Sequence, residues 1–296
     1  MNKLTSQQRV QAIACLVEGC SIRSTCRMTG LAKGTILKLL ADIGCVCAEF
    51  QHEHLTGLAA ERIQIDEIWA FCGAKQKHVE RGAMGYGDVW TWTAIDADTK
   101  LVPCWMVGGR DAGYATEFLA DLKGRLVNRV QLTTDGHKAY LEAVRDVWAS
   151  DEIDYAQIIK TYGKPDDADH RYSPPQCIGC ERHTISGEPD PDHVSTSYSE
   201  RQNLTMRMNM RRFTRLTNGF SKKLENHFHA VALHFMHYNF CRKHQTIKTT
   251  PAMAAGKADH VWTLDEVVEL LEAKERQAVE SGSLKRGKYR KREDSN

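Results

Sequence analysis

The sequence predicts a mixed α/β fold, in which a small helical unit precedes a sheet-containing domain. Apolar residues recur at helical spacing between residues 5 and 41, which indicates short helices. From residue 62 onward, runs rich in Ile, Val, Trp and Thr indicate strands, and helical patterns separate the later ones. The 296 residues suffice for one large and one small domain, and 42% hydrophobic with 26% charged residues is a globular balance.

The N-terminal unit is expected to hold three helices. Thr5 and Gln8 have the spacing of a capping box for the first helix, and Ser21 can cap the second. Gly30 supplies a turn, and a third helix is expected over residues 32–41. This is the layout of a helix-turn-helix DNA reader, whose third helix enters the major groove. The alternative is a helical bundle that serves only as an interface.

The expected third helix has an apolar and a polar side. Its predicted core side chains are Ile36, Leu37 and Leu40, and its predicted DNA contacts are Lys33, Thr35 and Lys38. We expect the DNA-binding domain to span residues 1–45 and a linker to span residues 46–60. Four possible zinc ligands lie near this linker, but their spacing is not that of a standard zinc site, so zinc is the less favoured alternative: Cys45, Cys47, His52 and His54.

The larger domain is expected over residues 61–255. Its predicted strands are 62–71, 89–96, 101–107, 129–134 and 155–159, and its predicted helices are 113–126, 137–147, 198–217 and 224–238. Three strands, a helix, a strand, a helix, a strand and a helix form the element order of the ribonuclease H-like fold. A long loop is expected over 160–197. Residues 256–296 add a helix at about 264–277, capped by Thr263, and a basic tail.

Two aspartates stand at positions where a carboxylate is costly unless it is paired or binds a metal. Asp66 lies in the middle of an apolar strand, and Asp135 ends another strand. Gly136 is expected to leave room beside Asp135 for a ligand. Strand alternation places Asp66 and Ile68 on one face and Glu67 on the other, so Glu67 is expected to point away from Asp66.

A third acid begins a helix with a strongly polar side. Glu200, Asn203, Arg207 and Arg211 recur at spacings of three and four, so they are expected to share one helical face. Three carboxylates can hold a pair of divalent cations such as Mg²⁺, which activates a water or a 3′-hydroxyl for phosphoryl transfer. The neighbouring guanidinium groups can grip DNA phosphates.

The net charge of +2 conceals a strong local asymmetry. Residues 201–250 contain ten basic residues and only one acid, Glu225. Such an excess is typical of a nucleic-acid partner, although solvated helix faces and a basic tail are the alternative. The expected DNA contacts in this segment are Asn203, Arg207, Arg211, Arg212 and Arg215.

Composition also bears on the cellular compartment. The sequence has no run of 18 apolar residues, so no membrane span is expected, and the polar N-terminus does not resemble a secretory signal. The ten cysteines have no framework spacing and are expected to be reduced thiols. We therefore expect a cytoplasmic, nucleoid-associated protein.

Three further groups of residues allow a structural and a functional interpretation. In the long loop, zinc is the less favoured alternative to an unliganded segment for His170, Cys177, Cys180 and His183. Core packing is preferred to base stacking for Trp69, Trp90, Trp92 and Trp105. Packing or surface positions are preferred to a metal cluster for His227, His229, His234 and His237.

The acidic blocks resemble the DDE transposases of bacterial insertion sequences, in particular the group named after insertion sequence one. The resemblance covers about residues 60–255 and rests chiefly on three blocks, residues 64–71, 134–140 and 198–207. Residues 211–217, and Tyr238, Asn239 and Phe240 followed by Arg242, His244 and Pro251, also look like that family.

The resemblance implies a catalytic core of the ribonuclease H-like class that cleaves and joins DNA strands with Mg²⁺, or with Mn²⁺ in its place. It implies metal-binding roles for Asp66, Asp135 and Glu200, and it matches Arg207 to a basic residue of the family. The implied partners are the double-stranded transposon ends, the target DNA and further copies of the chain. Two alternatives stay open: an inactive, regulatory DNA-binding protein and a ribonuclease H-type nuclease.

Overall fold

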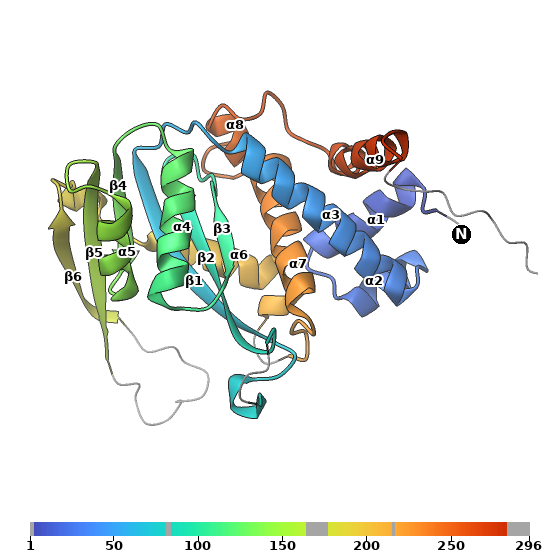
Figure 1. The fold of residues 1–296 in the computed structure, drawn as a ribbon, viewed down its shortest axis with the longest axis horizontal. Coiled ribbons are helices and arrows are strands. Elements are labelled where there is room, and N and C mark those ends of the chain that lie inside the picture. The colour runs from blue at the N-terminus through green and yellow to red at the C-terminus, as the bar shows by residue number, and fades with distance from the viewer. Residues whose placement is uncertain (1–2, 81–83, 164–176, 215–216, 283–296) are drawn as a thin grey trace, which may run out of the picture.

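The fold is a six-stranded mixed sheet with helices on both faces and a helical body at one end (Figure 1). The computed structural model describes residues 3–80, 84–163, 177–214 and 217–282. The sheet order is β3-β2-β1-β4-β5-β6. The strands are β1 (Arg62–Cys72), β2 (Gly87–Asp96), β3 (Trp105–Gly108), β4 (Val130–Asp135), β5 (Ile153–Tyr162) and β6 (Cys177–Ser186).

The central strand β1 has two very different neighbours. It pairs with β2 along its whole length, from Ile63 opposite Asp96 to Cys72 opposite Gly87. Its parallel pairing with β4 stops after Gln64. Beyond that point β1 and β4 diverge, and the sheet has a fork between them.

Helices cover both faces of the sheet (Figure 1). On one face, α4 (Ala112–Arg125) and α5 (Ala139–Val147) pack their apolar side chains against odd-numbered residues of β1 such as Ile65. On the other face, α6 (Ser197–Asn209) and α7 (Leu224–Met236) pack against even-numbered residues such as Ile68. This two-sided burial follows from the alternation of side chains along a strand.

The N-terminal helices are α1 (Ser6–Val17), α2 (Ile22–Thr29) and α3 (Lys33–His54). The caps predicted at Thr5 and Ser21 are confirmed, as is the turn at Gly30, which has a φ of 71°. These helices share one hydrophobic core with α7 and with α9 (Leu264–Glu280), so the first helices and the last helix pack into one helical body (Figure 1).

The prediction of a linker over residues 46–60 was wrong for most of that segment. Helix α3 continues to His54 because its apolar spacing continues through Ile43 and Cys47, both of which are buried. Gln51 anchors this second half by donating hydrogen bonds to the backbone oxygens of Cys47 and Ala232. The segment taken for a linker is therefore the surface on which α7 packs.

Three more boundaries differ from the prediction. Part of the expected loop over 160–197 is a strand, because β6 pairs antiparallel with β5. Helix α6 ends at Asn209, and a separate 3-10 turn, Arg211–Phe213, follows it. Helix α7 continues as a short π-helical turn, His237–Cys241. The remaining elements are the short helix α8 (Pro251–Ala254) and two 3-10 turns, Gln76–His78 and Pro191–His193.

The element order predicted from residue 62 to β5 is confirmed, and so is the Thr263 cap of α9, which forms a capping box with Glu266. None of the helices in the described ranges combines the length and the apolar content that a bilayer crossing requires.

Candidate functional site

Three carboxylates converge where β1 and β4 part. One oxygen each of Asp66, Glu67 and Asp135 lies within 4.8 Å of the other two. Among the residues that the structure describes, they form the only group of three or more His, Cys, Asp or Glu side chains placed in this way. The fork explains the convergence, because the ladder between β1 and β4 ends two residues before Asp66 and leaves a gap that side chains can enter.

Asp66 is held from two sides. Its Oδ1 accepts a hydrogen bond of 2.8 Å from the backbone N–H of Glu67, and its Oδ2 accepts one of 2.7 Å from Asn203 Nδ2. Burial, and then the negative charge of Asp135, raise the pKa of Asp66 to about 7. Such a group favours proton or cation binding near neutral pH.

Glu67 belongs to the cluster although it leaves β1 on the other face, as alternation predicts: it bonds to Arg110 before α4, whereas Asp66 bonds to Asn203 on α6. Alternation sets the direction of the Cα–Cβ bond, but the long Glu67 side chain still brings an oxygen within reach of the aspartates at the fork. The side chain is fully buried, and Oε2 has no hydrogen-bond partner among the described residues. Burial and then Asp135 raise the pKa of Glu67 to about 7.

Arg110, which the sequence analysis missed, is the cation of the cluster. Its Nε donates to Glu67 Oε1 over 3.2 Å, and its Nη2 lies 3.9 Å from Asp135 Oδ2. Its guanidinium carbon lies 4.5 Å from the centre of the Trp90 ring. Arg110 comes from the segment between β3 and α4, and no local sequence signal placed it beside β1.

Asp135 occupies the end of β4 as predicted. Its Oδ1 accepts a 3.0 Å hydrogen bond from the backbone N–H of His137. The reason for Gly136 differs from the predicted one, because a Cβ there would lie 3.1 Å from Ile159 Cγ1. Gly136 therefore makes room for Ile159.

Two aromatic side chains, Tyr140 and His137, lie near the carboxylate cluster. Tyr140 is fully buried, and its hydroxyl has no hydrogen-bond partner among the described residues. Burial and then the charges of Glu67 and Asp135 raise its pKa well above the usual value. His137 accepts the backbone N–H of Ala139 on Nδ1 over 3.1 Å, and burial followed by Arg110 lowers its pKa.

Glu200 lies beside the cluster and is bound elsewhere. Its Oε1 forms an ion pair with Lys160 and accepts a 2.8 Å hydrogen bond from Thr196 Oγ1. About half of its side chain is exposed. It is near enough to contribute to the raised pKa of Asp66, but it is not one of the three converging carboxylates.

The predicted DNA contacts on α6 and after it divide into separate groups. Asn203 is buried and bonds to Asp66, whereas Arg207 lies on the last turns of α6. Because α6 ends at Asn209, the prediction that Arg211 shares its face was wrong. Arg211 is exposed on the 3-10 turn. Arg215 lies outside the described residues.

Arg212 is half-buried and bonds to the interior of the protein. Its Nη1 donates to Ser221 Oγ over 2.9 Å, and Ser221 Oγ in turn lies 2.8 Å from His227 Nδ1. Burial lowers the pKa of Arg212 to about 10 and that of His227 to about 3. This chain of contacts joins the 3-10 turn to α7, which gives Arg212 a structural role.

On α3, Lys33 and Lys38 are exposed and Thr35 is half-buried. Lys38 pairs with Asp42 over 2.6 Å. Of the predicted core side chains, Ile36 and Leu40 are buried and Leu37 is half-buried.

The residues considered for zinc do not assemble a site in the described ranges. Cys47 is buried in the helical core, whereas Cys45 is exposed and its Sγ lies 3.4 Å from Glu49 Oε1. On β6 the sulfurs of Cys177 and Cys180 lie 3.5 Å apart. His170 lies outside the described residues.

Two predictions about aromatic and histidine packing have separate outcomes. Trp92 is fully buried, but the prediction of a core position was wrong for Trp69, which is 38% exposed. His227 and His234 are buried, as the packing interpretation expects. Burial lowers the pKa of His234 to about 3, so this ring is neutral near pH 7.

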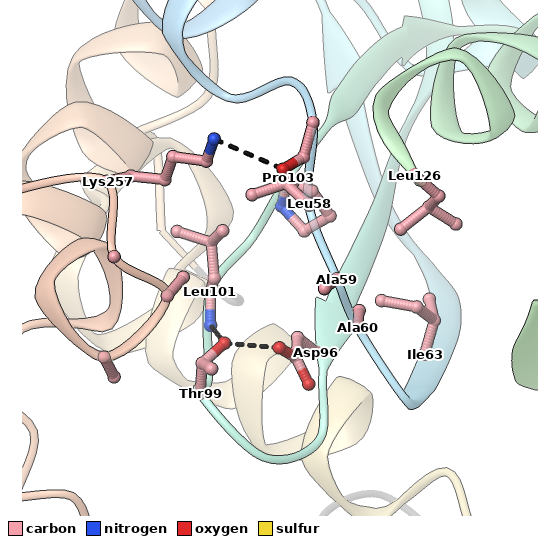
Figure 2. Close-up of a pocket in the computed structure, with 14 residues that line it drawn as sticks. Leu58, Ala59, Ala60, Ile63, Asp96, Thr99, Leu101, Pro103, Leu126 and Lys257 are labelled. Atoms are coloured by element: carbon pink, nitrogen blue, oxygen red, sulfur yellow. Dashed lines mark hydrogen bonds between the residues drawn. The ribbon is translucent and has the colours of Figure 1, made fainter. Parts of the chain in front are cut away.

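A pocket of about 330 Å³ lies apart from these carboxylates (Figure 2). Its walls come from the segment before β1, the β2–β3 connection and the segment after α8, and they include none of the four acids discussed above. Lys257 closes one side by donating a 2.5 Å hydrogen bond to the backbone oxygen of Thr56. The pocket residues are largely apolar, with Asp96 bonded to Thr99 at the edge (Figure 2).

No protein-family model and no curated protein matches this sequence. Among solved structures, the chain is similar to a piggyBac transposase synaptic complex with hairpin DNA, at 12% identity and a TM-score of 0.40 over 97% of this chain and 76% of that one. It is also similar to a pre-cleavage Mos1 transpososome, at 8% identity and a TM-score of 0.29 over 98% and 82%. A Mos1 strand transfer complex matches at 12% identity and a TM-score of 0.23 over 52% and 59%.

The site thus presents clustered acids at a strand fork, one cation between them and an amide that orients Asp66. Such an oxygen-rich cluster has the donor chemistry that hard divalent cations prefer.

Proposed function

We propose that this protein is a metal-dependent DNA strand-cleaving and strand-joining enzyme of the DDE transposase class, with a ribonuclease H-like core. The observation that carries the proposal is the convergence of Asp66, Glu67 and Asp135 at the fork between β1 and β4. Isolated acids are common on protein surfaces, but three like-charged carboxylates this close together in a partly buried gap favour a bound proton or a counter-ion.

The residues present fit a divalent cation. Glu67 Oε2 is buried without a hydrogen-bond partner among the described residues, and Arg110 is the one cation that contacts the cluster in that part of the chain. Asp66, Asp135 and Glu67 would hold the metal, and we propose Glu200, from the sequence resemblance, as a further ligand. Bound Mg²⁺ or Mn²⁺ would supply an activated water or 3′-hydroxyl and stabilise the leaving oxygen.

The chain's own residues would position the DNA around this site. Asn203 fixes the orientation of Asp66 through its 2.7 Å hydrogen bond. Arg207 and Arg211 would contact phosphates as charged donors, and Arg110 would balance the charge of the carboxylates when a phosphodiester approaches. Such phosphate contacts predict an affinity for DNA that falls steeply with salt.

We further propose that α2 and α3 act as a helix-turn-helix reader of the transposon ends. The αL turn at Gly30 and the exposed Lys33 at the start of α3 support this role. Assembly of several copies on DNA stays a prediction.

The test is strand transfer by the purified full-length protein on a labelled duplex that carries the terminal repeats flanking its gene. Joined product is expected with Mg²⁺ or Mn²⁺ and not with EDTA. It should be lost in Asp135→Asn and Glu200→Gln and retained in the matched control Glu117→Gln, an exposed acid on α4. Equal cleavage of random duplexes, without joining, would instead identify a ribonuclease H-type nuclease.

One observation favours a second candidate, a DNA-binding regulator without catalysis. Glu200 is paired with Lys160 and does not join the three converging carboxylates. Sequence-specific binding to the terminal repeats, with no cleavage under any metal, would support the regulator and contradict the enzyme.

A further inference from the structure

An aromatic row leads away from the carboxylate cluster along β1. Glu67, Trp69 and Phe71 alternate with the residues that face α6, so they lie on the same side of the strand. Successive members of such a set are about 7 Å apart along the strand. The ring centres of Trp69 and Phe71 are 5.8 Å apart, and those of Phe71 and Phe220 are 4.6 Å apart.

Phe220 reaches this row because its segment runs beside the end of β1. Cys72 forms a parallel bridge with Ser221, and the backbone N–H of Gly73 donates to Ser221 O over 2.8 Å. We define the rings of Trp69, Phe71 and Phe220 as the aromatic row. These rings come from two distant parts of the sequence. The row begins at Trp69, two residues after Glu67 on the same side of β1.

The aromatic row is accessible to solvent. Nearer the centre of the sheet, α4 and α5 cover the same face of β1. Ile63 and Ile65 are buried in the core that α4 and α5 form with the sheet. Trp69 is 38% exposed, and Phe71 and Phe220 are half-buried. Exposed aromatic surface beside a polar site is typical of a binding surface, because its hydration is unfavourable unless a ligand covers it.

Cations lie at both ends of the row. The Arg110 guanidinium carbon is 4.5 Å from the centre of the Trp90 ring, and Trp90 pairs with Trp69 across β1 and β2. Lys222 Nζ lies 3.1 Å from the centre of the Phe220 ring. Aromatic faces flanked by cations suit a ligand that has flat rings and negative charges, which is the chemistry of a nucleic-acid strand.

We propose that the aromatic row binds unpaired nucleobases of the DNA strand next to the phosphodiester held at Asp66, Glu67 and Asp135. The proposal rests on the proposed function for the identity of that strand. Bases inside a duplex have both faces stacked, so the row selects bases that have left the helix or lie in a single-stranded flank. Stacking on aromatic side chains tolerates any base, so the row adds affinity without reading sequence.

The test measures binding in EDTA, where no cleavage occurs. Fluorescence anisotropy compares a labelled ten-thymidine strand with a labelled duplex for the full-length protein. Trp69→Leu should weaken binding of the single strand roughly tenfold and leave duplex binding nearly unchanged. Trp69→Phe, which keeps an aromatic face, should restore most of the affinity. Phe228→Leu is the matched control, because Phe228 is 37% exposed on α7, outside the row.

Equal single-strand affinity in Trp69→Leu and in the unchanged protein would overturn the proposal. So would equal losses for single strand and duplex, or a change of oligomeric state without DNA, which would assign the row to contact between copies. Failure of metal-dependent cleavage with Trp69-dependent strand binding intact would contradict only the proposed function. Normal cleavage with no effect of Trp69→Leu on binding would contradict only this inference.

Discussion

Asn203 Nδ2 donates a 2.7 Å hydrogen bond to Asp66 Oδ2, which ties helix α6 to the central strand at the carboxylate cluster. Asn203 is buried, and its side-chain oxygen has no hydrogen-bond partner among the described residues. This single contact therefore sets how Asp66 presents its second oxygen.

Replacing Asn203 with Ala should weaken metal binding without removing a carboxylate. Loss of the donor leaves Asp66 less well oriented, and substitutions of groups that orient ligands typically cost about 10- to 100-fold in metal affinity or activity. The measurement is the Mg²⁺ concentration that gives half-maximal cleavage. Asn209→Ala at the end of α6 is the control, and an unchanged Mg²⁺ requirement in Asn203→Ala would contradict the positioning role.

Glu67→Gln should stabilise the metal-free protein in a pH-dependent way. The pKa of Glu67 is raised to about 7 when folded, whereas an unfolded glutamate titrates near ~4.3, so the folded state binds an extra proton between these values. Its contribution to the unfolding free energy is therefore favourable at low pH and is lost as pH rises toward 7. Chemical denaturation should show the variant gaining on the order of 1–3 kcal/mol over the unchanged protein between pH 4.5 and 7.5.

The same variant separates this electrostatic cost from function. If Glu67 binds the metal, Glu67→Gln should lower the rate of metal-dependent cleavage by at least about tenfold while the protein becomes more stable. A stability difference that does not change with pH would contradict the raised pKa of Glu67.

His234→Phe should have the opposite pH dependence. Burial lowers the folded pKa of His234 to about 3, below the unfolded value of ~6.5, so the unfolded state binds the extra proton in between. The stability that neutral His234 contributes is present above pH 6.5 and is lost as pH falls. The unfolding free energies of the variant and of the unchanged protein are measured by denaturation at pH 7.5 and pH 5. The variant should be relatively more stable at pH 5. A difference in unfolding free energy that is the same at both pH values would contradict the lowered pKa of His234.

Arg212 and Arg211 should respond differently to truncation, although both are basic and adjacent. Arg212→Ala removes the part-buried hydrogen bond to Ser221, so we expect a loss of about 1–3 kcal/mol in unfolding free energy. Arg211→Ala, at an exposed position, should change stability by less than ~0.5 kcal/mol and weaken DNA binding at low salt. Equal destabilisation by the two variants would contradict the structural role of Arg212.

Lys160→Gln tests whether Glu200 takes part in metal binding. The ion pair with Lys160 competes with a metal for the Glu200 carboxylate, so its removal should lower the Mg²⁺ concentration needed for cleavage severalfold. An unchanged Mg²⁺ requirement in Lys160→Gln with Glu200 intact would count against Glu200 as a ligand.

Much of the fold and part of the site follow from local sequence. Thr5, Ser21 and Thr263 cap helices through hydrogen bonds to residues three positions away, and the strands that carry Asp66 and Asp135 follow from short apolar runs. These features depend on neighbours in the chain, so spacing alone predicts them. The roles of Asp66, Asp135 and Glu200 stay a prediction of the same kind.

Tertiary structure decided the rest, because it depends on contacts between distant segments. Glu67 joins Asp66 only because β4 leaves β1 after Gln64, and Arg110 reaches both strands from a loop. Strand β6 is specified by its pairing with β5, since nearly all of its residues are exposed and none is buried in the core. Local patterns determine which elements form, whereas burial and charge at the fork, which set the chemistry of the site, arise only when strands far apart in the chain pack together.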